Sequence, residues 1–371
     1  MHYDVRGLAR YTVELFRAMK ELAGDEIELF SFSPGAPATE FLAELDVTPV
    51  IFQARRELLW EHVELPRQLR RLRIEVFHET AERGLPYPRA CKLVLTRHDI
   101  IDRLPEYCVG ENWRGRLRKR LGDFVSVHSA DKFLTVSEFS RQDICRFYGL
   151  SAERVVVTHN AAHPRFLEKA MDEEKARIRA QYALPQTYLL FLGGFDAKKN
   201  VGALVEAYAL LPRDAPAFVL AGVRKWEYSK IAARIHELGL GQRMHCPGRI
   251  DDADLPALYQ AALAFVHPSR YEGFGLQLVE AMSSGIPVLA SNTTSLPEVL
   301  GDAGLLFDPT NPKAIALEIE RIYRDPNLRA ELAARGRERA RQFSWRRTAS
   351  QTLRLYLKLL GRSDEFLYSE P

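Results

Sequence analysis

Two glutamates that flank a glycine-rich turn are the residues of this sequence best suited to chemistry. Glu272 precedes Gly273 and Gly275, which allow the open or left-handed backbone of a tight turn, and Glu280 follows on an expected short helix. A fully helical span would hold the two carboxylates about 12 Å apart, at about 1.5 Å per residue. Because half of the span is a loop, we expect both carboxylates to face one cleft and to contact the two ends of an elongated polar ligand.

The turn between the glutamates is expected to bind an anion. The unpaired N–H groups of Phe274, Gly275 and Leu276 would lie at a helix N-terminus, where the helix dipole also favours a negative group such as a diphosphate. An anion site between two hydroxyl-binding carboxylates indicates a nucleotide sugar as the ligand. The alternative is an ordinary strand–helix turn with two surface glutamates.

A second phosphate-binding pattern lies upstream. Residues 188–192 are expected to form a buried strand, followed by two glycines, by Lys198 and Lys199, and by a helix over residues 201–211. Glycines and cations that open a helix are suited to phosphate groups. The spacing matches neither a Walker A loop nor G-x-G-x-x-G, which argues against an ATPase and a nicotinamide dehydrogenase. We predict that Lys199 contacts phosphate and that Lys198 faces solvent.

The N-terminal half offers two weaker candidates. Gly7 directly precedes an amphipathic helix expected over residues 8–22, in the position of a phosphate-binding turn, although the first strand of the sheet is apparently missing. His98 ends an apolar, strand-like segment, and the carboxyl ends of parallel strands are where α/β sheets bind ligands. It could act as a base or orient a hydroxyl group, or it could be a structural histidine.

Composition narrows the classes of protein that remain. The chain has 371 residues, of which 46% are hydrophobic and 27% charged, and its net charge of +3 argues against a general nucleic-acid binder. No apolar run approaches the ~20 residues of a membrane span, and no signal peptide is recognisable. The 4 cysteines form no C-x-x-C pair. We therefore expect a reduced cytoplasmic protein without a zinc site.

Positive charge is concentrated in one expected helix, within residues 110–132. Its cations are Arg114, Arg116, Arg118, Lys119 and Arg120. A solvated helix face explains them in the plainest way. The alternative hypothesis is peripheral contact with an anionic membrane, at the inner face of the plasma membrane, since each cation near such a surface contributes about 1 kcal/mol.

Strands and helices alternate through both halves of the chain. This order predicts the α/β class, with one doubly wound parallel sheet in each half. The length also exceeds that of one ordinary domain. We place the domains at residues 1–165 and 166–345, with a connecting helix over residues 166–186 and a C-terminal helix and tail over residues 346–371.

These motifs together resemble the retaining glycosyltransferases of the GT-B fold. The most similar group is the large bacterial family of mannosyl- and glucosyltransferases, glycosyltransferase family 4, group 1. The resemblance is carried by Gly7-Leu-Ala-Arg-Tyr-Thr, His98-Asp99, Thr135–Ser140, Lys198-Lys-Asn200, the two glutamates with their turn, and Phe343-Ser-Trp345. It implies two Rossmann-like domains that face each other across a cleft, with the C-terminal helix returning to the N-terminal domain.

The resemblance also implies roles for individual residues. Glu272 and His98 would be catalytic, through contacts with the donor sugar or the acceptor, and Glu280 would bind the ribose hydroxyls. The other donor-binding residues would be Gly7, Lys198, Lys199, Arg249, Ile250, Phe274, Gly275 and Leu276. Neither a metal ion nor a cofactor is implied, because Lys199 would neutralise the leaving diphosphate. The donor substrate would be a GDP- or UDP-sugar.

The implied activity is transfer of a hexosyl unit, with mannose slightly favoured, to a saccharide or lipid-linked acceptor in surface polysaccharide assembly. Retention in this family is explained by same-face attack within an oxocarbenium-like ion pair, so no enzymic nucleophile is required. The alternative is a non-catalytic nucleotide-sugar-binding protein with the same fold.

Overall fold

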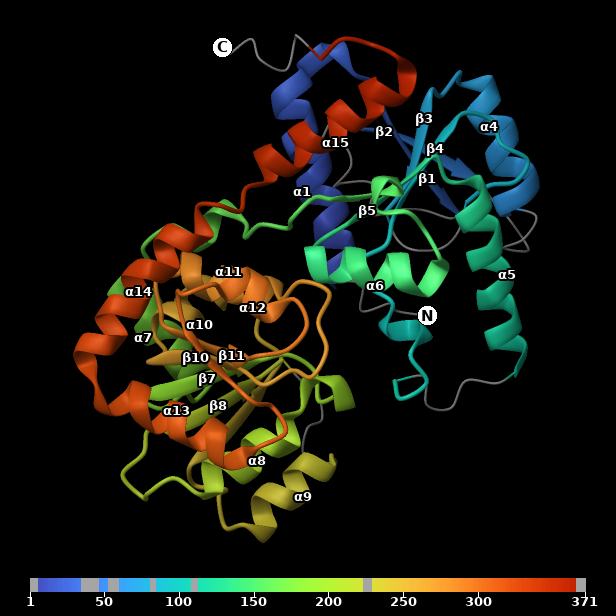
Figure 1. Ribbon diagram of the computed structural model, residues 1–371. Helices are drawn as coiled ribbons and strands as arrows, with labels where there is room; N and C mark the ends of the chain where they lie inside the picture. Colours follow the sequence, from blue (N-terminus) through green and yellow to red (C-terminus); the bar gives the residue numbers. More distant parts are fainter. Residues whose placement is uncertain are drawn as a thin grey trace. The chain divides into compact units, whose positions relative to one another are not determined.

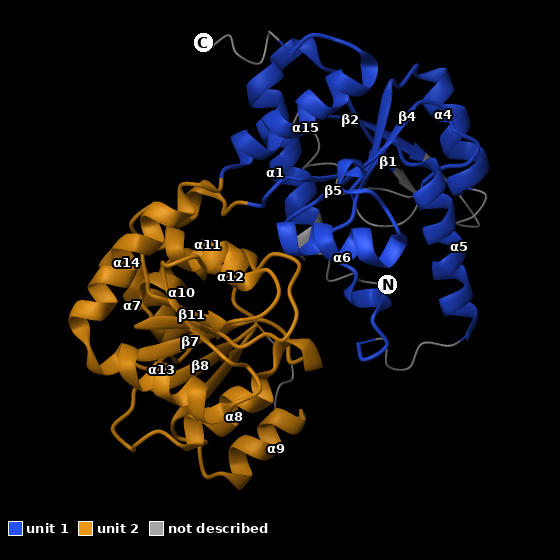
Figure 2. Cartoon of the chain, viewed as in Figure 1, with its two compact units in different colours: residues 1–160, 344–371 blue, residues 161–343 orange. Residues whose placement is uncertain are grey.

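The chain forms two compact units (Figure 2). The computed structural model describes residues 6–34, 47–52, 60–80, 85–107, 113–222 and 229–364. Residues 1–160 and 344–371 make the first unit, and residues 161–343 make the second. The first unit is therefore built from both ends of the chain, and the second is inserted between them as one continuous segment.

The second unit is built on a parallel sheet in the order β12-β11-β10-β7-β8-β9. Its strands are β7 (Tyr188–Leu192), β8 (Ala217–Ala221), β9 (Met244–Gly248), β10 (Ala264–His267), β11 (Val288–Ser291) and β12 (Leu305–Phe307). The order reverses between β7 and β10, as in a doubly wound sheet. The continuous apolar runs of β7 and β10 are buried, because helices cover both faces of the sheet (Figure 1).

The helices of the second unit are α7 (Asp172–Gln181), α8 (Val201–Ala209), α9 (Lys230–Glu237), α10 (Leu255–Gln260), α11 (Leu276–Ser283), α12 (Leu296–Leu300), α13 (Pro312–Arg324) and α14 (Pro326–Ala340). The connecting helix expected over residues 166–186 corresponds to α7, which lies within this unit. Its Arg177 donates to the buried carboxylate of Asp254 at 2.5 Å. This ion pair fixes α7 against the segment that leads into α10.

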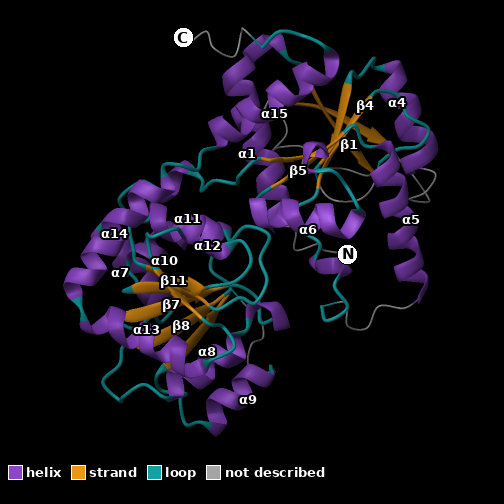
Figure 3. Cartoon of the chain, in the orientation of Figure 1, coloured by secondary structure: helices purple, strands orange, loops and turns teal. Residues whose placement is uncertain are grey.

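The first unit contains a parallel sheet in the order β3-β4-β5-β6. Figure 3 draws strands in orange and labels β4 and β5 of this sheet. Its strands are β3 (Val76–Glu79), β4 (Lys92–Thr96), β5 (Lys132–Thr135) and β6 (Val155–Val157). Where one sheet was expected, β1 (Leu29–Pro34) and β2 (Val47–Phe52) pair with each other as a separate parallel ribbon in the described part of the chain. The helices are α1 (Arg6–Ala23), α4 (Leu65–Arg71), α5 (Trp113–Ser129), α6 (Glu138–Tyr148) and α15 (Trp345–Leu360), with a π-helical turn over Trp60–Glu64.

The C-terminal helix returns to the first unit, as the resemblance implies. The Trp345 ring of α15 meets the Tyr11 ring of α1 edge-on, with centroids 6.0 Å apart. A chain of hydrogen bonds then crosses the unit. Tyr11 Oη lies 3.1 Å from Thr96 Oγ1, which lies 2.6 Å from His78 Nε2, and His78 Nδ1 lies 2.5 Å from Tyr356 Oη of α15. These hydrogen bonds connect α1 to α15 through residues of β3 and β4.

Candidate active site

The loop that carries Lys199 and the loop that carries Glu272 meet at the point where the strand order of the second unit reverses. In an open parallel sheet, ligands bind beyond the carboxyl ends of the strands at this switch point. Here the loop over residues 193–200 follows β7, and the loop over residues 268–275 follows β10. The N–H of Arg270 donates to the carbonyl of Lys198 at 2.7 Å, which holds the two loops together.

Glu272 is the centre of a buried charged cluster in this place. Its Oε1 accepts from Lys199 Nζ at 2.7 Å and lies 3.3 Å from His267 Nε2. The Lys199 and Glu272 side chains are only 11% and 12% exposed. Burial by itself would raise the pKa of Glu272, but the Lys199 ammonium and the His267 hydrogen bond hold it well below its usual range. The carboxylate is therefore ionised at neutral pH.

His267 is a residue of this cluster that the sequence analysis missed. It is the last residue of β10 and is fully buried. Burial lowers its pKa, against the opposing effect of Glu272, so the ring is neutral at pH 7 and its Nε2–H donates to the Glu272 carboxylate. Ser269 Oγ lies 3.2 Å from the same nitrogen. The available signal was a histidine that ends a buried strand five residues before the glutamate.

The loop after β11 fixes the backbone of Glu272. The Glu272 N–H donates to Thr294 Oγ1 at 3.3 Å, and Ser295 Oγ donates to the Glu272 carbonyl at 2.9 Å. Thr294 has a φ of +57°, which is unusual for a β-branched residue and typical of functional sites. The position of the carboxylate thus depends on contacts from a third loop.

Asn200 joins three loops at the same edge of the sheet. Its Nδ2 donates to the carbonyls of Pro268 at 3.1 Å and Pro309 at 2.8 Å, and its Oδ1 accepts from Arg270 Nε at 3.0 Å. Asn200 has a φ of +54°, a left-handed conformation that asparagine tolerates better than most residues. Its side chain therefore positions the end of the Lys199 turn.

The glycine turn leads into a helix, as the sequence predicts. Gly275 precedes α11 with a φ of +89°, and a Cβ added there would lie 2.6 Å from Leu296 Cδ2. A glycine is therefore required by both the backbone angle and the available space. Phe274 and Leu276 lie on either side of it, so their N–H groups are at the start of the helix. Glu280, on α11, is 2% exposed and accepts from Tyr259 Oη at 3.1 Å.

The remaining donor-site candidates of this unit follow β7 and β9, which lie on one side of the point where the strand order reverses. Arg249, which is exposed, and Ile250, which is buried, directly follow β9. Lys198 is partly exposed and contributes its carbonyl to the contact between the loops. In the described ranges, no three His, Cys, Asp or Glu side chains gather as metal ligands would.

His98 and Gly7 belong to the first unit. His98 lies two residues beyond β4, its ring meets Tyr11 edge-on at 4.7 Å, and burial lowers its pKa to about 4, so it is neutral at pH 7. The expected turn at Gly7 is wrong, because α1 already begins at Arg6 and Gly7 lies within its first turn. The expected absence of a strand before Gly7 concerns residues 1–5, which lie outside the described residues.

Two family descriptions together match most of the chain. Residues 172–339 match "Glycosyl transferases group 1", and residues 5–166 match "Glycosyltransferase Family 4". The O-antigen chain mannosyltransferase B of Escherichia coli is 36% identical over 96% of this chain and 97% of its own length. The MMP alpha-(1->4)-mannosyltransferase of Mycolicibacterium hassiacum is 31% identical over 76% of this chain and 68% of its own.

Solved structures agree with the assignment of the fold. The Anabaena protein HepE, solved in complex with UDP and glucose, superposes with a TM-score of 0.76 at 19% identity, over 96% of this chain and 98% of that one. A glycosyltransferase from Rickettsia africae gives a TM-score of 0.77 at 17% identity, over 95% of both chains. The chain therefore belongs to the group 1, family 4 glycosyltransferases and has the GT-B fold.

Proposed function

We propose that this glycosyltransferase is a retaining, metal-independent mannosyltransferase. It moves a hexosyl unit from a nucleotide-diphosphate sugar, carrying GDP or UDP, to a saccharide or lipid-linked acceptor in surface polysaccharide assembly. The observation that carries the proposal is the buried Glu272–Lys199–His267 cluster beside the glycine turn of α11. The choice of mannose and of polysaccharide assembly is supported by the 36% identity to an O-antigen chain mannosyltransferase.

The donor's diphosphate would lie between Lys199 and the start of α11. An ammonium group has three N–H donors, and Glu272 accepts one of them, which leaves two for phosphate oxygens. The N–H groups at Gly275 and Leu276 would bind further phosphate or sugar oxygens. As the bond to the sugar breaks, negative charge develops on the diphosphate, and a fixed cation in a buried site stabilises that charge without a metal ion.

The chemistry of Glu272 favours a role in binding the sugar over a role as nucleophile. Its Oε1 is already engaged by Lys199 and His267, and its pKa is held well below the usual range, so the carboxylate is a weak base and a weak nucleophile. The same carboxylate is a strong acceptor for sugar hydroxyl groups. These properties support same-face attack within an ion pair, in which the leaving phosphate takes the acceptor's proton.

The test compares Glu272→Gln with Glu280→Gln in EDTA, using GDP-mannose and UDP-glucose as donors. We expect Glu272→Gln to lower turnover by about 100-fold or more while donor affinity changes by less than about threefold, and Glu280→Gln to weaken donor affinity first, by about tenfold. The exposed Glu331→Gln is the matched control and should change neither quantity. Equal effects of the two site variants on both quantities would contradict this division of roles.

Two further results would overturn parts of the proposal. A product with inverted configuration at the anomeric carbon, seen by NMR, would exclude retention, and loss of activity in EDTA that Mg²⁺ restores would exclude metal independence. Donor binding without turnover of any acceptor would favour the non-catalytic alternative.

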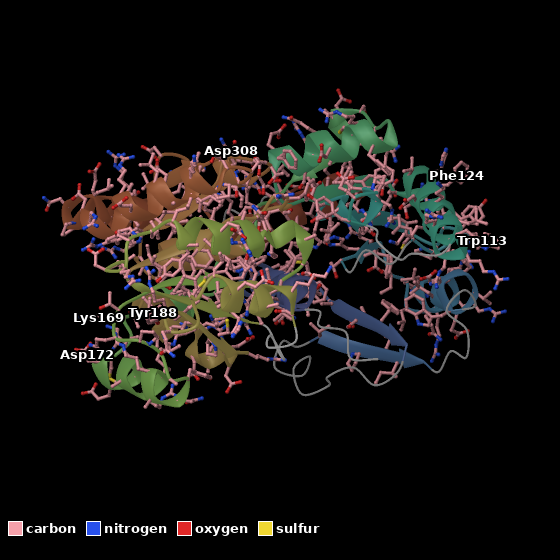
Figure 4. All side chains as sticks on the ribbon, turned by 90° about the horizontal axis from the view of Figure 1, so that it is seen from below. Trp113, Phe124, Lys169, Asp172, Tyr188 and Asp308 are labelled. Atoms are coloured by element: carbon pink, nitrogen blue, oxygen red, sulfur yellow. The ribbon has the colours of Figure 1, made fainter. Side chains whose placement is uncertain are left out.

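Contact with an anionic membrane is proposed for α5, whose Trp113 and Phe124 are labelled in Figure 4. Four large apolar residues on this helix are between 50% and 63% exposed, and their spacing of three or four residues places them on one face: Trp113, Leu117, Leu121 and Phe124. Basic residues flank this apolar stripe, although Lys119 also donates to the Asp102 carbonyl at 3.1 Å. Exposed apolar residues flanked by cations are features of helices that lie on a membrane surface.

The described residues include no helix that is both long and apolar enough to cross a bilayer. The membrane proposal is checked by sedimentation with vesicles that contain phosphatidylglycerol. Charge reversal at Arg116 and Arg120 should release the protein from them. Binding that is unchanged by this double substitution would refute the proposed contact.

A further inference from the structure

Glu280 of α11 is held by a tyrosine of the preceding helix. Tyr259 Oη donates to Glu280 Oε2 at 3.1 Å, and both residues are buried, with 0% and 2% of their surface exposed. The hydrogen bond joins α10 to α11 between residues that are 21 positions apart in the sequence. Because a phenol is a neutral donor, this hydrogen bond fixes the carboxylate without neutralising its charge.

The Tyr259 ring is fixed by two other aromatic rings. Phe166 meets it with centroids 5.8 Å apart and an interplanar angle of 73°, and Phe265 of β10 meets it at 5.4 Å and 69°. Both arrangements are edge-to-face, which aromatic pairs prefer. A ring in a close-packed core cannot swing away without opening a void, so the Tyr259 hydroxyl has a defined position.

The backbone that carries Tyr259 is fixed as well. Tyr188 Oη, from β7, donates to the Leu258 carbonyl at 2.8 Å. The Gln260 side chain makes two hydrogen bonds, of 2.7 and 2.9 Å, to the backbone of residues 168–170. The residues on both sides of Tyr259 are therefore bound to other elements of the second unit, and its hydroxyl is a rigid partner for Glu280.

We propose that Tyr259 is a positioning residue for the donor nucleotide, whose hydroxyl orients the Glu280 carboxylate toward the two vicinal hydroxyls of the ribose. The inference rests on the proposed function, with Glu280 as the residue that binds the ribose. A carboxylate that is already fixed binds a diol more tightly, because less side-chain freedom is lost on binding. Tyr259 uses one of the roughly four acceptor sites of a carboxylate, so its hydrogen bond is compatible with a bound diol.

A merely structural hydrogen bond would have a different signature. If the bond between Tyr259 and Glu280 only joined α10 to α11, its loss would lower stability or weaken every nucleotide equally. If it orients Glu280, its loss weakens only ligands that carry the ribose hydroxyls. The two roles therefore differ in the preference for a nucleotide over its 2′,3′-dideoxy analogue, which lacks both hydroxyls.

The test titrates GDP and UDP into the full chain by calorimetry and compares the tighter of the two with its 2′,3′-dideoxy analogue. We expect the wild type to bind the ribonucleotide at least about tenfold more tightly, because a site built for hydroxyl groups rejects a ligand without them. Tyr259→Phe should reduce this preference at least about threefold, since the hydrogen bond that orients the carboxylate is lost. Its affinity for the dideoxy analogue should stay within about twofold of wild type.

Tyr208→Phe is the matched control. Tyr208 is also fully buried, meets Phe218 edge-on at 5.7 Å, and donates from Oη to the Pro216 carbonyl at 2.8 Å. Loss of this hydroxyl should leave the nucleotide preference unchanged, even where it lowers Tm as much as Tyr259→Phe does. Glu280→Gln should remove most of the preference, and Tyr259→Phe added to Glu280→Gln should change it no further, because no carboxylate remains to be positioned.

Three results would overturn the positioning role of Tyr259. The first is an equal preference in Tyr259→Phe and wild type while Glu280→Gln loses it, which would leave the proposed function intact. The second is equal weakening of both ligands in Tyr259→Phe, which would assign the hydrogen bond to the fold alone. The third is a wild type without preference for the ribonucleotide, which would remove the ribose role of Glu280 itself and is therefore distinguishable from the other two.

Discussion

Removal of the Lys199 ammonium should convert the most stabilised carboxylate of the site into a buried, uncompensated charge. Lys199→Met keeps the length and apolar stem of the side chain and deletes only the charge and its 2.7 Å hydrogen bond to Glu272. The two side chains are 11% and 12% exposed, so solvent screens the pair little. Breaking a buried pair from one side typically costs about 3–5 kcal/mol. In a domain of 150–250 residues, that loss corresponds to a fall in Tm of about 6–20 °C.

The double variant Lys199→Met/Glu272→Gln separates charge from packing. Replacement of both partners by neutral groups is often nearly neutral for stability, so the double variant should recover most of the loss. We expect a coupling energy above about 2 kcal/mol, measured by calorimetric unfolding of the four proteins of the cycle. Lys198→Met is the matched control, because Lys198 is partly exposed and contacts the neighbouring loop through its carbonyl. Its effect should stay within about 0.5 kcal/mol.

The pH dependence gives an independent check with a defined sign. In the wild type the pKa of Glu272 is depressed, so its contribution is present above the ordinary glutamate pKa and is lost as pH falls through the lower folded value. In Lys199→Met, burial dominates and raises the pKa of Glu272. The loss of stability relative to wild type should therefore appear as the pH rises and shrink as the pH falls toward the ordinary glutamate pKa. Two results would refute this reasoning. The first is a Lys199→Met protein that is as stable as wild type at pH 7, and the second is a double variant that is no more stable than Lys199→Met.

Three other changes have defined outcomes. Gly275→Ala should lower the free energy of unfolding by about 1–2 kcal/mol, because of its left-handed backbone, and should also lower nucleotide affinity. Gly241→Ala, at an exposed position, is the control and should change neither quantity. Equal effects of the two variants in calorimetry would contradict this prediction. His267→Phe should lower kcat more than it raises KM, because the Glu272 carboxylate loses the hydrogen bond from His267 Nε2. His267→Gln, which can still donate a hydrogen bond, should restore part of the lost kcat. A change in KM alone would oppose a positioning role for His267. Burial lowers the pKa of His78 to about 3, so below pH 6.5 the unfolded chain takes up a proton that the folded chain does not. The free energy of unfolding should therefore fall as the pH drops from 6.5 toward 3, and His78→Gln should make this fall less steep. A pH dependence that is unchanged in His78→Gln, measured by urea unfolding, would argue against this account.

The parts of the site that sequence reasoning could predict are those set by neighbouring residues. The turn at Gly275 was predictable, because a glycine with a required positive φ followed by a short apolar helix is a local pattern. The strand–glycine–lysine segment before α8 was predictable for the same reason. The strand before His98 was predictable, since β4 is an apolar run, although it ends at Thr96 and His98 lies two residues beyond it.

The parts that could not be predicted depend on contacts between distant segments. Thr294 contacts Glu272 from the loop after β11, and Tyr259 contacts Glu280 from α10; no spacing in the sequence specifies these pairs. His267 is near Glu272 in sequence, at the end of β10, but the strand pattern does not show that its ring contacts the carboxylate. The separate β1–β2 ribbon was missed because strand patterns do not show which strands pair. At Gly7 the error was one of boundary: a glycine is expected before a helix, yet α1 already begins at Arg6.

The return of α15 to the first unit has a consequence for synthesis of the protein on the ribosome. The second unit is continuous in sequence, so all of its strands have been made before α15 leaves the ribosome. The first unit lacks the partner of Tyr11 and His78 until Trp345 and Tyr356 have emerged. A chain that stops short of residue 345 would therefore contain the whole second unit but leave exposed the part of the first unit's core that packs against α15. In such a truncated chain, the exposed apolar surface would thus lie in the first unit, which the N-terminal part of the chain forms, and chaperones and proteases bind surfaces of this kind.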